Sequence, residues 1–280
     1  NSQGVPQWIN GLYDSSGSFG FSGLELMSAA DSSVYLGGIF TNGVTIAGTN
    51  NSISATGIGG GPPRSTVFIA RFDLNGNANL LEPIVKFTSS NSLSTPGDIK
   101  AIDNNSFYYT GSHNDANQFG SNNQTFTNLT SAAVVAKFTN ANCDWLRAGT
   151  SSSPFFSSFN PNIAIDNNNN LVVAGTFRST LNFQSTTVNS SIANGLNWFS
   201  ARFNPAGNLL TLKNYNINGT SLQDMTINSK NETIVIGNYR DSIELNGTKR
   251  FSNGGEDILV VALEDNLDLK WFQTGGGGNF

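Results

Sequence analysis

The chain has 280 residues and a formal net charge of −5, and only 12% of its residues are charged. Its 14 lysines and arginines are scattered along the chain, which excludes the basic stripe of a nucleic-acid-binding surface. No apolar run approaches the roughly 18 residues that span a bilayer, so no membrane span is expected. The Asn-rich, Lys-poor composition and an N-terminal Asn1 in place of Met favour a secreted or cell-surface protein, either freed of a signal peptide or cut from a longer chain.

The first predicted element is a strand over 6–13, which forms an outer strand and linker region at 1–23. Four copies of one unit follow it, and together they predict a single region over 1–280, with units at 24–87, 98–149, 162–215 and 224–274. Each unit opens with a short apolar strand, a, an Asp/Asn turn and a second strand, b, that ends near Gly38, Gly111, Gly175 or Gly237. Apolar strand runs separated by Asp/Asn turns are typical of hairpins.

A longer stretch then carries a small alternating segment, such as 181–188 or 243–251, which predicts an extra hairpin projecting from each unit. The third and fourth strands, c and d, complete the unit. They are predicted at 67–73 and 80–87, 134–139 and 144–147, 198–204 and 209–215, and 258–264 and 269–273. A four-stranded antiparallel unit repeated at this period is typical of a β-propeller blade.

The copies resemble the bacterial SBBP-type β-propeller repeats, which are related to NHL repeats. The resemblance rests on Ile-Ala-Val-Asp, a polar turn, Val-Tyr-Val-Thr-Gly, Phe-Val-Ala-Lys and a Trp strand in that order. The third copy matches best, from Ile163-Ala164-Ile165-Asp166 through Leu171 and Gly175 to Trp198. The resemblance implies an all-β propeller of four-stranded antiparallel blades in a surface protein.

The segment 6–13 matches the last d strand at 269–274, because Trp8 and Trp271 fall at the same place. The chain therefore holds five d-like strands but four copies of a, b and c. This surplus predicts a part of a larger propeller, polypeptide or assembly. The alternative is a closed ring of four blades in which the Trp8 strand completes the last blade.

Two turns carry alternating oxygen ligands that resemble a calcium loop. These candidates are Asp73, Asn75 and Asn77 in one turn, and Asp166, Asn168 and Asn170 in the other. No bidentate Glu lies at the expected distance, and Asp/Asn runs are ordinary hairpin chemistry. We therefore expect no metal and no cofactor, with calcium as the weaker alternative.

The remaining candidates are more readily structural than catalytic. His113 is the one histidine, has no second His or Cys to help it, and is expected in a solvated loop. Cys143 lacks an activating base and is expected to be a packed or loop cysteine in a hairpin. Trp8, Trp145 and Trp271 share one d-strand position, which favours packing between blades over a sugar platform.

The predicted core comprises a-strand and b-strand residues that meet between blades, namely Met27, Ile102, Ile165, Ile227, Tyr35, Val173 and Val235. No catalytic constellation is visible, so a non-catalytic module for protein interaction, adhesion or spacing is the leading hypothesis, with the b–c inserts as its binding face. Its partner would be a protein or a glycan. A lectin-like carbohydrate-binding propeller is the first alternative, and a polysaccharide-active enzyme whose carboxylates are brought together by the fold is the second.

Overall fold

The computed structural model describes residues 7–13, 22–28, 32–40, 43–46, 52–54, 66–86, 95–113, 118–126, 132–151, 161–190 and 195–278. Over these ranges every regular element is a strand, and every strand pairing is antiparallel. The predicted all-β class is therefore confirmed. The same ranges contain no helix that is long and apolar enough to cross a membrane.

Four repeats follow one another, each with four strands in chain order. The first repeat contains β2 (Ser22–Ser28), β3 (Val34–Phe40), β6 (Thr66–Phe72) and β7 (Ala78–Lys86). The second contains β8 (Thr95–Ala101), β9 (Ser106–His113), β12 (Ala132–Thr139) and β13 (Asn142–Thr150). The third contains β14 (Asn162–Ile165), β15 (Leu171–Phe177), β18 (Asn197–Phe203) and the first half of β19 (Leu209–Ile227).

The fourth repeat begins without a break, because β19 continues into it. Residues 209–218 of β19 pair with β18, and residues 219–227 pair with β20. The interruption predicted between 215 and 224 is therefore replaced by one long strand that joins two repeats. The remaining strands of the fourth repeat are β20 (Thr233–Leu245), β21 (Thr248–Leu263) and β22 (Leu269–Gly275).

In the first three repeats the small strands between b and c do not project, which corrects the prediction, but extend the sheet of the preceding unit; in the fourth repeat the predicted hairpin is formed by the far ends of β20 and β21. We call the small strands of the first three repeats the clasp hairpins: β4 (Gly43–Ile46) with β5 (Ser52–Ser54), β10 (Gln118–Phe119) with β11 (Gln124–Thr125), and β16 (Thr180–Phe183) with β17 (Thr186–Asn189). The first pairs with β1 (Leu12–Tyr13), the second with β7 and the third with β13. Each clasp hairpin thereby covers an outer strand edge whose N–H and C=O groups would otherwise lack partners.

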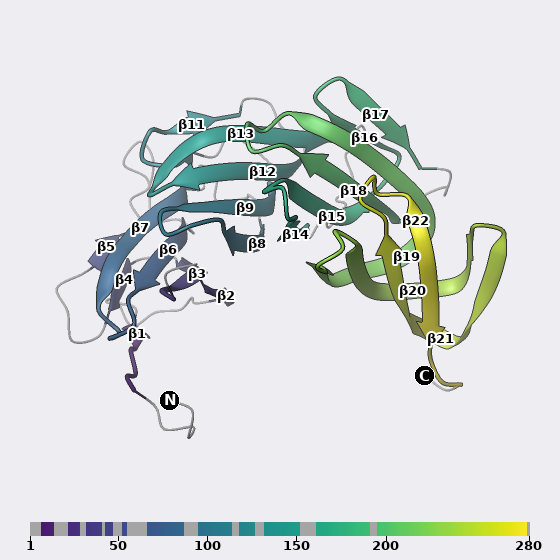
Figure 1. Cartoon of the computed structure of the whole chain (residues 1–280), viewed down its shortest axis with the longest axis horizontal. Coiled ribbons are helices and arrows are strands. Elements are labelled where there is room, and N and C mark those ends of the chain that lie inside the picture. The colour runs from purple at the N-terminus through teal and green to yellow at the C-terminus, as the bar shows by residue number, and fades with distance from the viewer. Residues whose placement is uncertain are drawn as a thin grey trace.

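The repeats lie side by side along an open arc (Figure 1). Their innermost strands β2, β8, β14 and the second half of β19 are neighbours in that order. One end of the arc contains β1, and the other contains β21 and β22. No pairing among the described strands joins the two ends.

The core consists of apolar layers between successive repeats. Tyr35, Val173 and Val235 are buried in these layers, as predicted. Met27 lies on a described strand, but its side chain lies outside the described part. The other predicted a-strand residues, Ile102, Ile165 and Ile227, lie beside the turns at the margin of these layers, where they are half-buried and pack against the core. The positions at the centre of each layer are two or three residues earlier: Ile99, Ile163 and Met225.

Candidate binding surface on the inner strands

The two turns predicted as weak calcium candidates are closed by their own hydrogen bonds. In the turn between β6 and β7, Asp73 Oδ1 accepts the backbone N–H groups of Asn75 and Asn77, each at 2.8 Å. Its Oδ2 accepts the amide of Asn77 at 3.0 Å, and these hydrogen bonds, led by that side chain, lower the pKa of Asp73. The carboxylate thus serves as the acceptor of an Asx-type turn.

The turn between β14 and β15 repeats this arrangement. Asp166 Oδ1 accepts N–H groups from Asn168 and Asn170 at 2.8 Å, and Oδ2 accepts the amide of Asn170 at 3.0 Å. Arg202 adds a cation 3.6 Å from that carboxylate. Across the described residues no group of three or more His, Cys, Asp or Glu side chains gathers in a way that could hold a metal ion.

Two tryptophans at the predicted d-strand position interlock neighbouring repeats. Trp145 of the second repeat donates its indole N–H to Pro205 O at 3.0 Å and lies 6.5 Å from the ring of Phe203 in the third. Gly207 lies under the indole with a φ of 78°, and a Cβ there would lie 2.6 Å from the ring. Its carbonyl accepts Arg147 Nε at 2.7 Å, so this turn requires glycine for both its backbone and its space.

Trp8 makes the same set of contacts with the turn of the first repeat. Its indole donates to Leu74 O at 3.0 Å, and its ring stacks on Phe72 at 5.9 Å. Asn10, two residues further along, donates to Gly76 O at 2.6 Å. Both tryptophans therefore pack between successive strand units, which is the role that their shared position predicted.

The histidine and the cysteine are both buried. His113 is 1% exposed at the end of β9, which corrects the prediction of a solvated loop, because the clasp hairpin strand β10 covers it with Phe119. Its Nε2 lies 2.9 Å from the Tyr109 hydroxyl, and desolvation lowers its pKa to about 3. Burial likewise raises the pKa of Cys143 to about 12, so its thiol stays protonated and unreactive near neutral pH.

The adjacent acidic residues Glu256 and Asp257 do not converge on one site. The two residues are neighbours on β21, so their side chains point to opposite faces of the strand. Glu256 is held by Arg240 at 2.8 Å, whereas Asp257 is buried and accepts the backbone N–H of Asn253.

An open hollow lies along the inner strands of the second, third and fourth repeats. One part has a volume of about 450 Å³ and is walled by β8, β14 and β19 around Ile165 and Thr226. A neighbouring part of about 270 Å³ is more polar. The polar side chains of this inner hollow are Asp98, Lys100, Asn162, Gln223 and Asp224.

Asp98 links two strands of the inner hollow, β8 and β14, by hydrogen bonds. Its Oδ1 accepts the N–H of Ile99 at 2.7 Å and lies 3.3 Å from Lys100 Nζ, while Oδ2 accepts the N–H of Ile163 in the next repeat at 3.1 Å. Asp224 occupies the equivalent place in the fourth repeat, is exposed, and accepts the N–H of Met225 at 2.7 Å. These carboxylates orient backbone and bind cations or amides, whereas acid–base chemistry needs a carboxyl group free to exchange a proton with a substrate.

Sequence reasoning missed the inner hollow because it assigned no role to the polar residues at the start of these units. A signal was present, since Asp98, Asn162 and Asp224 each stand directly before the buried residue of that strand. A polar residue at one repeat position in three copies indicates a shared contact, and the structure shows it for Asp98.

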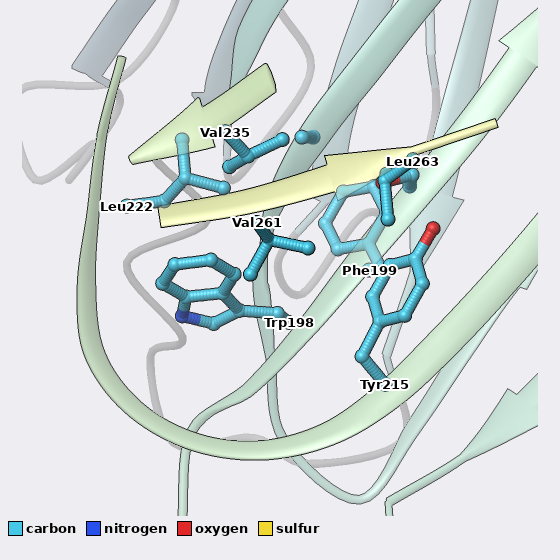
Figure 2. A pocket seen from close by; sticks show the side chains of 9 residues that line it. Trp198, Phe199, Tyr215, Leu222, Val235, Val261 and Leu263 are labelled. Carbon is cyan, nitrogen blue, oxygen red and sulfur yellow. The ribbon is translucent and has the colours of Figure 1, made fainter. Parts of the chain in front are cut away.

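A second cavity is enclosed between the third and fourth repeats (Figure 2). It is lined by apolar side chains that include Trp198, Leu222 and Val261. Its volume is about 10 Å³, which is the space of one water molecule. This cavity is therefore a packing gap and is too small to take a ligand.

Comparison of the chain with models of known protein families and with curated proteins found no match.

Proposed function

We propose that the chain is a non-catalytic module of the SBBP-type β-propeller class, secreted or displayed at a cell surface, that serves protein interaction, adhesion or spacing. The repeated four-stranded units, the layers of core between them and the arc of the inner strands support the propeller arrangement. The Asn-rich, Lys-poor composition supports the extracellular location. The burial of His113 and Cys143 and the backbone contacts of Asp98 support a role other than catalysis.

The observation that carries the interaction role is the exposed hairpin of the fourth repeat. It is formed by the far ends of β20 and β21, where Ser242 pairs with Phe251 and Leu245 pairs with Thr248. Phe251 is 68% exposed, and Lys249 Nζ lies 4.9 Å from the centre of its ring. An exposed aromatic ring beside a cation is the kind of anchor that protein interfaces bury.

The experiment is a binding screen against immobilised extracellular proteins, with release of reducing sugars from a polysaccharide panel measured in parallel. We expect binding without turnover, and loss of binding in Phe251→Ala. Leu210→Ala is the matched control, because Leu210 is 53% exposed on another part of the arc. Turnover of any polysaccharide, or equal binding by the two variants, would contradict this proposal.

Carbohydrate binding is the second candidate, and the inner hollow favours it. Asn162, Gln223 and Asp224 place amide and carboxylate groups along one open wall, and such groups hydrogen-bond sugar hydroxyls. Against it, the tryptophans Trp145 and Trp198 are buried and offer no stacking platform there. Glycan-array binding that Asn162→Ala abolishes and Phe251→Ala spares would select this candidate over the first.

A further inference from the structure

We propose that two copies of this chain close head to tail into one ring of eight repeats, in which β22 of each copy replaces the Trp8 strand of the other. The ring is the closed form of the propeller arrangement proposed above and rests on it. The two end faces of the arc correspond to the faces that meet at the three joints between repeats inside it.

The end face of the fourth repeat exposes positions that are buried at every inner joint. Ile236 and Ile258 are 39% and 52% exposed. The pairing register makes Ala174 and Trp198 their equivalents in the third repeat, because β15 pairs with β18 as β20 pairs with β21. Ala174 is fully buried and Trp198 is 2% exposed.

The end face of the first repeat is exposed in the matching place. Leu26 on β2 is 68% exposed, whereas its equivalents in the other repeats are at most 5% exposed: Ile99, Ile163 and Met225. At the inner joints these residues pack on the face of the preceding repeat. Leu26 of one copy therefore has the position and the chemistry to pack on Ile236 of the other. Burying both would remove apolar surface from water at each joint.

Trp271 identifies the strand that is exchanged. It pairs with Ala262, one residue before the end of β21, as Trp145 pairs with Lys137, one residue before the buried Phe138 of β12. Trp145 is 8% exposed because it lies on the turn of the next repeat, whereas Trp271 is 40% exposed.

The turn that Trp271 would need is present at the other end of the molecule. It is the Phe72–Gly76 turn, which holds Trp8 through the same contacts that Trp145 makes with the third repeat. In the ring, Trp271 donates to Leu74 O of the other copy, and Gln273 takes the place of Asn10.

The outer edge of β22 fits the same exchange. The edges of three outer strands, β1, β7 and β13, are covered by the clasp hairpin of the repeat that follows, whereas the outer half of β19 pairs with β18 and carries no clasp hairpin among the described residues. Within the described ranges β22 pairs only with β21. When residues 7–13 of the partner copy no longer pair with its clasp hairpin β4–β5, that hairpin is free to pair with the outer edge of β22.

Asp224 completes the joint. Asp98 accepts the N–H of Ile163 across the joint between the second and third repeats at 3.1 Å. Asp224 is the equivalent of Asp98, and Leu26 is the equivalent of Ile163, so Asp224 accepts the Leu26 N–H of the other copy. Each copy has one end face of the first-repeat kind and one of the fourth-repeat kind, and the two ends of the arc point in the same direction (Figure 1). Two copies can therefore join through two such contacts and close the ring.

The test is sedimentation of the 280-residue chain over a concentration series. We expect a reversible change from the 29.8 kDa monomer to a species of twice that mass. Trp271→Ala should weaken the dimer at least about tenfold, since a buried Trp anchor is lost. Trp8→Ala should strengthen it, because the strand that competes for the Phe72–Gly76 turn is weakened. Leu210→Ala, an exposed apolar residue away from both end faces, should leave the dimer unchanged.

A monomer at all concentrations in both the parent chain and Trp8→Ala would overturn the proposal, as would a dimer insensitive to Trp271→Ala. A mass that keeps rising with concentration would indicate an open filament in place of the ring, and it would also overturn the proposal. Small-angle scattering separates this failure from failure of the propeller arrangement. An arc-shaped monomer would reject the ring alone, whereas a profile that does not fit the arc would reject both.

Discussion

Lowering the pH from 7 to 5 should destabilise the chain through His113. The side chain is buried at the end of β9, its Nε2 lies 2.9 Å from the buried Tyr109 hydroxyl, and the ring of Phe119 packs against it. Burial disfavours the charged imidazolium and lowers the pKa from the ordinary 6.5 to about 3. The folded chain therefore keeps His113 neutral throughout this pH range.

The sign and size of the effect follow from proton linkage. Below pH 6.5 the unfolded chain binds a proton at His113 that the folded chain does not bind, so stability falls with pH until about pH 3. The limiting slope is about 1.4 kcal/mol per pH unit. Integration from pH 7 to pH 5 gives a loss of about 2 kcal/mol, a large part of the roughly 5–15 kcal/mol that stabilises a typical domain.

The assay is urea unfolding at pH 7, 6 and 5, followed by tryptophan fluorescence. His113→Gln is the matched variant, because its amide can still hydrogen-bond Tyr109 but binds no proton. His113 is the one histidine of the chain, so the variant should show a nearly flat profile between pH 7 and pH 5. A parent chain equally stable at pH 7 and pH 5, or a variant with the parent's slope, would refute the reasoning.

Three further predictions concern packing, backbone and metal. Ile163→Ala should lower the free energy of unfolding by about 2–5 kcal/mol in urea titrations, and the half-buried Ile165→Ala by clearly less, whereas equal losses would contradict the observed register. Gly207→Ala should cost about 1 kcal/mol or more in the same assay, because its φ is positive and the added Cβ meets an indole; an unchanged midpoint would mean that the turn adapts. EDTA or excess calcium should leave the melting temperature unchanged in differential scanning calorimetry, because Asp73 and Asp166 already accept their turns' N–H groups; a rise of several degrees with calcium would assign them an ion.

Local patterns were sufficient to predict the repeat units. Each unit was recognised by an apolar strand, an Asp/Asn turn and a second strand that ends near Gly. In three of the four units the strands predicted in this way nearly coincide with the observed ones. These features depend on backbone preferences within a few residues, which a single sequence carries. The shared position of Trp8 and Trp145 was also readable, since one packing role repeated along the chain leaves one residue type at one place.

Long-range pairing was not readable in the same way. The clasp hairpin strand β10 has only two residues, Gln118 and Phe119, and a segment this short carries no periodicity that names its partner. The burial of His113 depends on that pairing, so its environment was predicted wrongly. The continuity of β19 was missed because Asn216 and Gly219 favour a turn locally. Asn216 does adopt a φ of 50°, but pairing with β18 before it and with β20 after it continues across this irregularity.

The inner hollow shows the same limit. Asp98 could be identified as a repeated polar position, but its partner Ile163 lies in the next repeat. The depth and openness of the hollow depend on how strongly the arc curves, and curvature is a sum over all joints between repeats.

Because every clasp hairpin belongs to the repeat after the one it covers, the chain has a built-in order during its synthesis. The edge of β7 stays open until residues 118–119 leave the ribosome, which takes on the order of seconds at about 5–20 residues per second. During that interval the nascent chain presents an unpaired strand edge, the feature through which partly made β proteins associate wrongly. The first and second repeats are thus completed only by their successors, and slow translation between the outer strand and the next clasp hairpin would lengthen the time for which that edge is unpaired.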